Sequence, residues 1–427
     1  MNLKQKLWWA QHRTDVYKYS TIILLFLAVT ISIIYFTYSK FSSSNEMTIY
    51  ETTVEPFIKN DYFIASYIDG EWSNEIPGKD DGYIVDKVVC DNGATAIWDD
   101  EEWGINVRNA TKKVKCSVYF IVKPIYLRNT IQELATTDIT NFATDDPDNN
   151  IRYVGKDPNN YVYFNCSDYS NQSDSTCEKW RIIGVFKNMT KEDGSQADLV
   201  KIIRNDSLGN YSWDRTSNGS YSNDWSNSTL QKLLNSGAYY NATTGTYYND
   251  STTATNVDFT STGLKNDATR NAIESVVWNL GGLSSSPNTS TFYSAERGTT
   301  VYIGRPTTWT GKIAIMYPSD YGYATAGGST TNRATCMTTN FSSWDGSGVS
   351  DCKNNDYLFK GVYEWTLTSL SSDSRYVFVV GSDGRVRYSN RLYITPAVCP
   401  AAYLKSDVLL SGVGDGSSTQ PYQLKLS

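Results

Sequence analysis

The side chains best suited to chemistry lie on two short alternating segments, residues 375–380 and 385–391. Gly381-Ser382-Asp383-Gly384 joins them, and two residues between paired glycines are typical of a tight hairpin, because glycine adopts positive φ without strain. Closing the turn there pairs Phe378 with Arg387. Since strand side chains alternate between faces, one face carries Val377, Val379, Val386 and Tyr388. We call the other the display face, and it carries Tyr376, Phe378, Arg385, Arg387, Ser389 and Arg391.

The display face has the composition of a binding surface. Aromatic rings offer contact area at low entropic cost, and guanidinium groups donate forked hydrogen bonds to carboxylate or phosphate. Four arginines within 375–391, in a chain of net charge −7, predict a local positive patch that favours an anionic partner. We extend this predicted ligand-binding site to Tyr393. An ordinary solvated sheet face, whose charges prevent aggregation, is the competing interpretation.

Catalytic arrangements find little support. His12 is the only histidine, so the rest of the chain cannot form Ser-His-Asp or Cys-His centres or the common histidine-containing zinc sites. Carboxylate pairs for glycoside hydrolysis stay open, with candidates Asp320, Asp345, Asp351, Asp356 and Glu364. The acidic cluster 145–150 lacks the regular spacing of a calcium loop and is expected to be a solvated turn. We predict no catalytic residue, metal site or cofactor.

Residues 21–38 contain no charged side chain, and eighteen helical residues span roughly 27 Å, about the thickness of a hydrocarbon core. We predict a transmembrane signal anchor here. The basic residues before it place the tail 1–20 in the cytoplasm and the remaining chain outside the cell. A cleaved signal peptide is the alternative, but its apolar region is usually shorter, and no small-x-small cleavage pattern follows.

The composition is that of an extracellular protein rich in strands and turns. Tyrosine (32) far exceeds phenylalanine (14), and the central region is rich in Asn, Ser, Thr and Gly. The chain after the predicted anchor is acidic, which argues against nucleic acid as a partner.

Hydrophobic patterning divides the rest of the chain into three regions. Short alternating runs over 49–125 predict a small β-sandwich domain. Residues 126–150 are expected to be a linker, and 151–427 one α+β domain with long loops. Within it, helices are predicted at 228–235 and 267–280.

The cysteines fit an extracellular address, where disulfides persist. Placement on strands predicts a bridge between Cys90 and Cys116. The four following cysteines allow three connectivities, of which short separations favour the local pairs Cys166 with Cys177 and Cys336 with Cys352. Cys399 is left over, and we expect it to be a buried thiol without a special role.

Several motifs of the C-terminal region carry a family resemblance. They include Trp180-Arg181-Ile182-Ile183-Gly184, Asn223-Asp224-Trp225, Arg305-Pro306-Thr307-Thr308-Trp309, Met316-Tyr317-Pro318-Ser319-Asp320 and Glu364-Trp365-Thr366-Leu367-Thr368. Over roughly residues 80–425 the chain resembles surface proteins of gut Firmicutes and Tenericutes. In these proteins a membrane anchor and a small cysteine-containing β domain precede a C-type-lectin-like module. That module is similar in layout to formylglycine-generating domains and to the variable proteins of diversity-generating retroelements.

The resemblance implies a function and one departure from the family pattern. In the retroelement-targeted relatives the C-terminal hairpin binds ligand, which corresponds to 374–395 here. The family's Gly-Val-Arg-Pro reads Ala397-Val398-Cys399-Pro400 in this chain, so cysteine replaces an arginine. We therefore predict a membrane-anchored bacterial surface-binding or adhesion protein with a C-type-lectin-like domain and an unknown protein or glycan ligand. A cell-surface enzyme of formylglycine-generating or glycan-processing type is the alternative.

Overall fold

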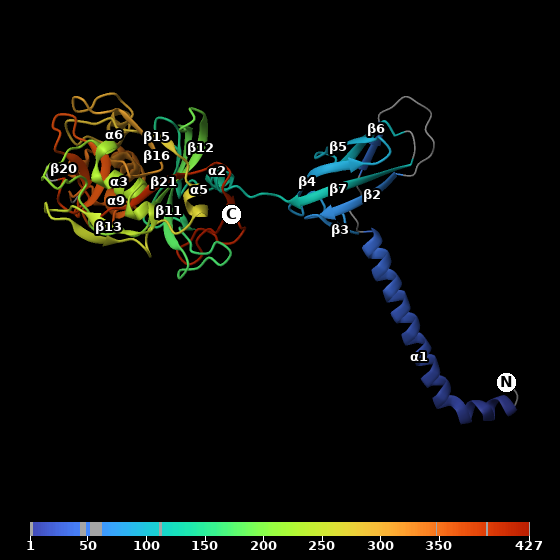
Figure 1. Cartoon of the computed structure of the whole chain (residues 1–427). Helices are drawn as coiled ribbons and strands as arrows, with labels where there is room; N and C mark the ends of the chain where they lie inside the picture. Colours follow the sequence, from blue (N-terminus) through green and yellow to red (C-terminus); the bar gives the residue numbers. More distant parts are fainter. Residues whose placement is uncertain are drawn as a thin grey trace. The chain divides into compact units, whose positions relative to one another are not determined.

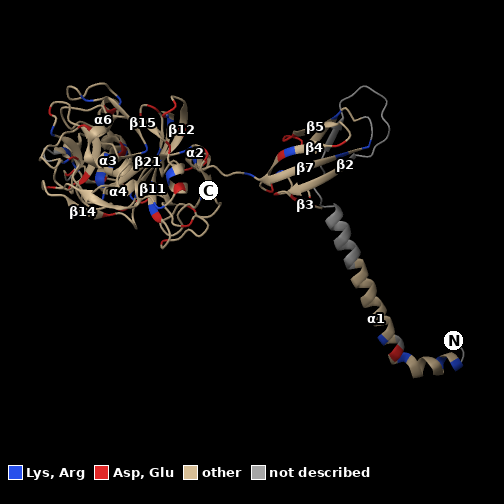
Figure 2. Ribbon diagram, viewed as in Figure 1, with Lys and Arg blue, Asp and Glu red and all other residues tan. Residues whose placement is uncertain are grey.

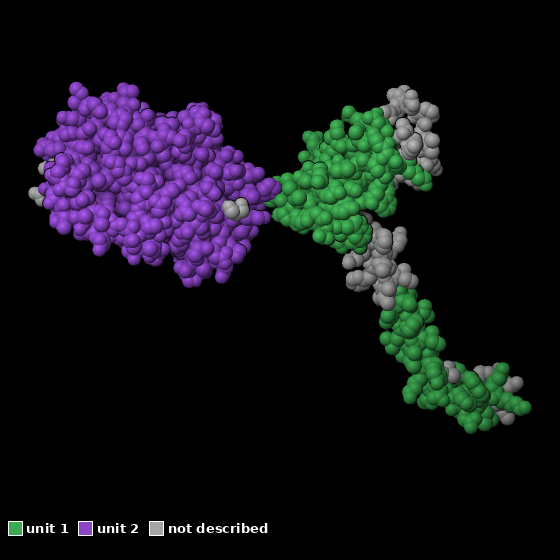
Figure 3. Space-filling view, viewed as in Figure 1, with its two compact units in different colours: residues 1–123 green, residues 124–427 purple. Residues whose placement is uncertain are grey.

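The computed structural model describes residues 3–42, 48–51, 62–110, 113–346, 348–389 and 392–426. The chain forms two compact units, Met1–Lys123 and Pro124–Ser427 (Figures 1 and 3). Each unit has a hydrophobic core of its own. The fold is mixed α+β and consists mostly of strands.

The first unit begins with the long helix α1 (Leu3–Ser42). Lys4, Lys6, Arg13, Asp15 and Lys18 lie in its first half, and no charged residue lies between Tyr19 and Ile31 (Figure 2). The apolar side chains Ile22, Leu24 and Phe26 are exposed. In α1 the structure describes side chains only as far as Ile31. Over the residues described in the protein, no single helix is long and apolar enough to span a membrane. The segments Lys4–Asp15 and Tyr17–Ile31, bent by 54°, reach that length and composition together.

The rest of the first unit is two small sheets that share one core. One sheet has the order β1 (Thr48–Glu51), β6 (Gly104–Arg108) and β5 (Thr95–Asp99). The other has the order β3 (Glu71–Ser73), β2 (Tyr62–Ile68), β7 (Val114–Val122) and β4 (Tyr83–Cys90). Ile105 and Val107 of β6 pack with Val118 and Phe120 of β7 in this core. This region therefore consists of small sheets, as its strand pattern predicts.

The second unit is built on a seven-stranded sheet. Its long central strands β11 (Glu178–Thr190) and β12 (Gln196–Arg204) are antiparallel neighbours and largely buried. The remaining strands are β17 (Ile313–Ile315), β21 (Pro400–Leu404), β9 (Ile151–Tyr153), β8 (Phe142–Ala143) and β10 (Tyr161–Phe164). Residues of β11, β12 and β21 contribute apolar side chains to one continuous core.

The linker predicted over 126–150 is wrong, because this segment belongs to the second unit. It contains α2 (Leu127–Thr137), whose Leu127 and Ile131 are buried in the main core. These two residues are four positions apart, so they share one face of the helix and dock it. Strand β8 then pairs with β9 at the sheet edge.

The two predicted helices differ in outcome. The first is α3 (Thr229–Asn235), whose N-cap Ser228 accepts a hydrogen bond from the Gln231 N–H. The second is only α5 (Asp267–Ala272), followed by strand β15 (Val276–Asn279). The prediction over 267–280 is wrong in its second half, because Val276, Val277 and Trp278 favour a strand and pair with β16 (Thr308–Gly311).

Short elements complete the second unit. A three-stranded sheet has the order β18 (Glu364–Ser369), β19 (Val377–Val380) and β20 (Val386–Ser389). The others are α4 (Ala238–Asn241), α6 (Thr289–Glu296), α7 (Pro318–Tyr323), α8 (Arg333–Thr338), α9 (Ser350–Asn354), β13 (Thr244–Tyr247), β14 (Thr255–Asp258), β22 (Leu409–Leu410) and β23 (Leu424–Lys425).

The disulfides are those predicted: Cys90–Cys116, Cys166–Cys177 and Cys336–Cys352. The first joins β4 to β7 at directly paired positions. Cys399 is a buried free thiol.

Candidate functional site

The predicted C-terminal hairpin forms, but its register differs by one residue from the prediction. Phe378 pairs with Tyr388 and Val379 with Arg387. The Gly381 N–H donates to the Arg385 carbonyl at 2.8 Å, and Gly384 has φ +85°. The connection is therefore three residues long, with a left-handed glycine that forms a bulge at its end. A slip of one residue moves every side chain of β20 to the opposite face.

The central part of the predicted display face is buried and so is not available to a ligand. All four residues of β19 are buried, including Phe378, whose ring lies 4.9 Å from that of Phe292 in α6. The prediction of Phe378 as an exposed ligand contact is wrong, because β19 is the middle strand of its sheet and both its faces are covered.

The described arginines of the hairpin are paired with aspartates. Arg385 forms an ion pair with Asp345, and Arg387 with Asp383. Arg375 pairs with Asp373 at 2.8 Å. These pairs remove the basis for the predicted positive patch. Arg391 and the side chain of Ser389 lie outside the described residues; the Ser389 backbone pairs with Val377.

Partly exposed tyrosines remain at this end of the hairpin. Tyr376 packs against Tyr388 with 5.5 Å between ring centroids, and Tyr221 packs against Tyr393 at 5.1 Å. Tyr388 is 48% exposed. We call this set the tyrosine surface, which consists of Tyr221, Tyr376, Tyr388 and Tyr393 with the flanking Arg215 and Arg375.

Hydrogen bonds and cation–π contacts hold the tyrosine surface together. The Asn223 side-chain amide donates to the carbonyls of Asp373 and Tyr376, which fixes the loop of Tyr221 beside the hairpin. Arg215 lies 4.9 Å from the Tyr393 ring centroid, and Arg375 lies 5.8 Å from that of Tyr376. Tyr376 and Tyr393 were predicted. Tyr388 was assigned to the core face by the wrong register, and Tyr221 comes from a distant loop.

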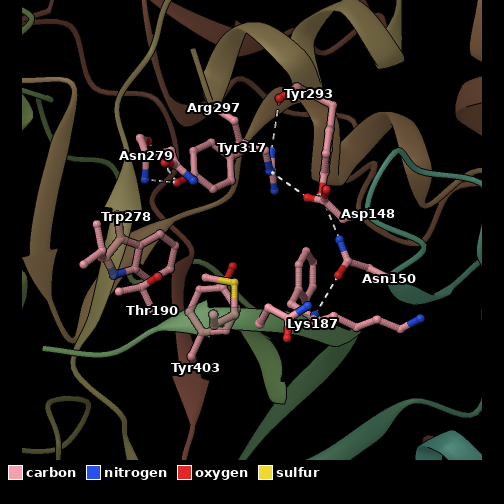
Figure 4. Close-up of a pocket in the computed structure, with 14 residues that line it drawn as sticks. Asp148, Asn150, Lys187, Thr190, Trp278, Asn279, Tyr293, Arg297, Tyr317 and Tyr403 are labelled. Carbon is pink, nitrogen blue, oxygen red and sulfur yellow. Dashed lines mark hydrogen bonds and ion pairs between the residues drawn. The ribbon is translucent and has the colours of Figure 1, made fainter. Parts of the chain in front are cut away.

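A separate pocket of about 190 Å³ opens in the second unit (Figure 4). Trp278 from β15 and Phe186 from β11 form part of its wall, together with Tyr317 and Tyr403. Polar side chains from several segments also line it. Four of these are Asp148 before β9, Thr190 at the end of β11, Asn279 at the end of β15 and Arg297 at the C-terminus of α6.

Arg297 organises one side of the pocket. Its guanidinium lies over the Tyr293 ring, 3.3 Å from the centroid, and its Nη1 donates to the Tyr293 carbonyl at 3.2 Å. Its Nε lies 3.6 Å from Asp148 Oδ2, which also accepts the Tyr293 hydroxyl at 2.6 Å. Asn150 donates to that hydroxyl at 2.8 Å. The side chains on this side are thus held in place by one another (Figure 4).

A buried ion cluster lies against the aromatic wall of the pocket. Arg152 contacts Asp146 through Nε at 2.6 Å and Asp320 through Nη1 at 3.1 Å. Lys201 Nζ lies 2.5 Å from the other oxygen of Asp320. The ammonium also lies 4.5 to 5.4 Å from the ring centroids of four aromatic residues, Phe186, Trp278, Tyr317 and Tyr403. Aromatic faces attract a cation in such positions.

The buried groups have shifted pKa values. Burial lowers the pKa of Lys201 to about 8, against the opposing effect of Asp320. Burial would raise the pKa of Asp320, but Lys201 and Arg152 outweigh it and lower that pKa. Burial raises the pKa of Glu296 to about 7, against the effect of Arg297. Glu296 therefore changes its charge near neutral pH.

Sequence reasoning missed the pocket. Asp148 was placed in a solvated acidic turn, and Arg297 and Trp278 carry no recognisable motif. One signal was available in Lys201, because a lysine inside the apolar run Leu199–Ile203 indicates a buried, paired charge. Arg152, between Ile151 and Tyr153 in β9, is a second signal of the same kind.

The carboxylates considered for glycoside hydrolysis have separate structural roles. Asp320 belongs to the ion cluster, and Asp345 binds a hairpin arginine. Asp351 accepts backbone N–H groups of the loop at 330–331. Asp356 and Glu364 are buried. Across the described part of the chain, no three His, Cys, Asp or Glu side chains gather in a group that could hold a metal ion.

Comparison of the chain with protein-family models, with curated proteins and with solved structures finds no match.

Proposed function

We propose that this protein is a membrane-anchored surface-binding protein, and that its C-terminal unit is a C-type-lectin-like domain that recognises a partner protein through the tyrosine surface. The observation that carries the proposal is the pairing of four partly exposed tyrosines from separate segments at one end of the hairpin.

Tyrosine suits protein recognition for a physical reason. Its ring offers a large contact area with few rotatable bonds, and its hydroxyl adapts to donors and acceptors. Ring pairing and the Asn223 hydrogen bonds hold the rings in place before binding, which lowers the entropic cost of association. Arginine stacked on tyrosine adds a residue type that is enriched at binding hot spots.

A preference for anionic partners is not part of this proposal. It depended on free arginines, whereas the described hairpin arginines each have an aspartate partner. We therefore favour a partner recognised by aromatic contact and hydrogen bonds.

Two observations support a location at the cell surface. Three disulfides are compatible with an oxidising compartment. The uncharged part of α1, residues 19–31, exposes its apolar side chains, which suits an anchor in lipid.

The enzymatic alternative of formylglycine-generating type would use two thiols. Six of the seven cysteines form disulfides, and the remaining Cys399 is buried beside Glu364, with its pKa raised well above the ordinary range by burial. This arrangement argues against that thiol chemistry.

An array of extracellular proteins, with a glycan array beside it, tests the proposal using the labelled full chain. We expect binding to at least one protein, and we expect Tyr388→Ala with Tyr393→Ala to weaken it by roughly tenfold or more, as hot-spot truncations do. Tyr363→Ala is the matched control, because Tyr363 is 44% exposed and outside the tyrosine surface. Binding that survives in the double variant, or binding to glycans alone, would refute the proposal.

A further inference from the structure

We propose that the pocket of Figure 4 is a second binding site, formed by residues other than those of the tyrosine surface, and that it holds one uncharged six-membered sugar ring. The inference does not depend on the proposed protein partner.

The size of the pocket sets the scale of the ligand. A dry cavity of about 150 Å³ holds one benzene ring, so a pocket of about 190 Å³ has room for one six-membered ring whose substituents reach the opening. Drug-sized ligands need about 300 Å³ or more. The pocket therefore fits a single ring, such as one unit at the end of a glycan.

The polar side chains of the pocket have unused hydrogen-bonding capacity. Within the described residues, Asp148 Oδ1, Arg297 Nη2, the Asn279 amide and the Thr190 hydroxyl form no hydrogen bond with another protein group. They provide an acceptor, a donor and two groups that do both. A hydroxyl group is itself both donor and acceptor, so neighbouring hydroxyls on a sugar ring match this mixed set.

The walls suit the apolar part of such a ring. Trp278 and Tyr317 present aromatic side chains toward the hollow (Figure 4), and the C–H faces of a sugar ring can pack on them. Both are fixed, because Trp278 Nε1 donates to the Gly311 carbonyl at 3.0 Å and the Tyr317 hydroxyl donates to the Asn279 carbonyl at 3.0 Å. A site fixed in advance loses little entropy on binding.

Charge balance favours an uncharged ligand over an ionic one. The cations of the pocket and of the ion cluster are matched by as many aspartates, namely Arg152, Lys201 and Arg297 against Asp146, Asp148 and Asp320. Glu296 adds a further carboxyl beside Arg297. The Lys187 side chain extends away from the hollow (Figure 4). An anion in the pocket would thus meet Asp148, and a cation would meet Arg297.

Saturation-transfer NMR on the full chain tests the proposal, with a zwitterionic detergent that carries no sugar headgroup. The probes are glucose, galactose, mannose and N-acetylglucosamine, with glucuronic acid and glucosamine as charged counterparts. We expect at least one neutral sugar to bind with a Kd in the millimolar range, the scale for about a dozen non-hydrogen atoms. Asp148→Ala and Asn279→Ala should each weaken it by about tenfold.

Two further variants sharpen the test. Asp148→Asn keeps the shape of the side chain, so it replaces Asp148→Ala if that variant loses stability, and it should also bind more weakly. Tyr388→Ala should leave sugar binding unchanged, which separates this site from the tyrosine surface. The proposal is overturned if no neutral sugar gives a signal, if a charged sugar binds better than every neutral one, or if the pocket variants bind as the parent does.

Discussion

At the scale of single residues, the second unit buries charges that it must compensate. Arg152, Lys201 and Asp320 are fully enclosed, and each charge would cost several kcal/mol without a partner. Asp320 serves both cations, and aromatic faces surround Lys201. Such a cluster fixes the residues around it, because any displacement leaves a buried charge unpaired.

Glu296 makes the stability of the second unit depend on pH. Its pKa is about 7 in the folded protein and 4.5 ordinarily. Between these values the folded state keeps a proton that the unfolded chain has released, so the free energy of unfolding falls by about 3 kcal/mol as pH rises to 7, then stays constant. Glu296→Gln should lose this contribution, whereas the smaller decline from Glu364, whose pKa burial raises to about 6, should remain. Urea denaturation at pH 5 and pH 8 measures the decline.

The control for this experiment is Glu192→Gln at an exposed position, which should retain the parent's pH dependence. An unchanged decline in Glu296→Gln would show that other groups cause it.

At the scale of elements, the hairpin shows how one turn residue decides which side chains face outward. Gly384 in the left-handed region lengthens the connection to three residues and places Tyr388 opposite Phe378. Phe378 then packs under α6 against Phe292, and Tyr388 reaches the surface.

Truncation of these two aromatic residues should therefore have unequal effects. Phe378→Ala removes a fully buried ring and should lower the free energy of unfolding by about 3–5 kcal/mol. Tyr388→Ala should cost about 1 kcal/mol or less, since its side chain is half exposed. Urea denaturation of both variants measures the difference. Equal costs, or a larger cost for Tyr388→Ala, would instead support the register predicted from the sequence, in which Phe378 is exposed.

At the scale of the whole molecule, each of the two units has a core and at least one disulfide of its own. Cys90–Cys116 closes a loop with a sequence separation of 26 within the first unit. Because the units have separate cores, we expect local damage to stay in the unit where it is made.

Removal of this bridge tests that independence. Cys90→Ser with Cys116→Ser should destabilise the first unit by about 3 kcal/mol, because the unfolded chain has more conformational entropy without the bridge. Hydrogen-exchange mass spectrometry should show protection lost in 83–122 and kept in 178–204. Cys166→Ser with Cys177→Ser is the mirror control and should affect only the second unit. Loss of protection in both units from either pair would mean that they unfold together.

Local pattern determined several features of this protein from sequence alone. Ser228 and the apolar positions after it specify α3, and the short cysteine separations anticipate the disulfides. These features depend on neighbours in the chain. Asn223 is different, because the carbonyls that it binds come from residues about 150 positions away.

Only the tertiary structure decided the register of the hairpin and the composition of both candidate sites. The burial of β19 depends on packing against α6, and the turn at Gly384 lies against Lys353 of α9, whose Nζ donates to the Asp383 carbonyl at 2.7 Å. Alternation along the strand encodes neither contact. Asp148, Thr190, Asn279 and Arg297 come together because β11, β15 and α6 meet there. These side chains can bind a ligand because some of their donors and acceptors have no hydrogen-bond partner in the protein. Which atoms stay unpaired depends on how all the neighbouring residues pack around them.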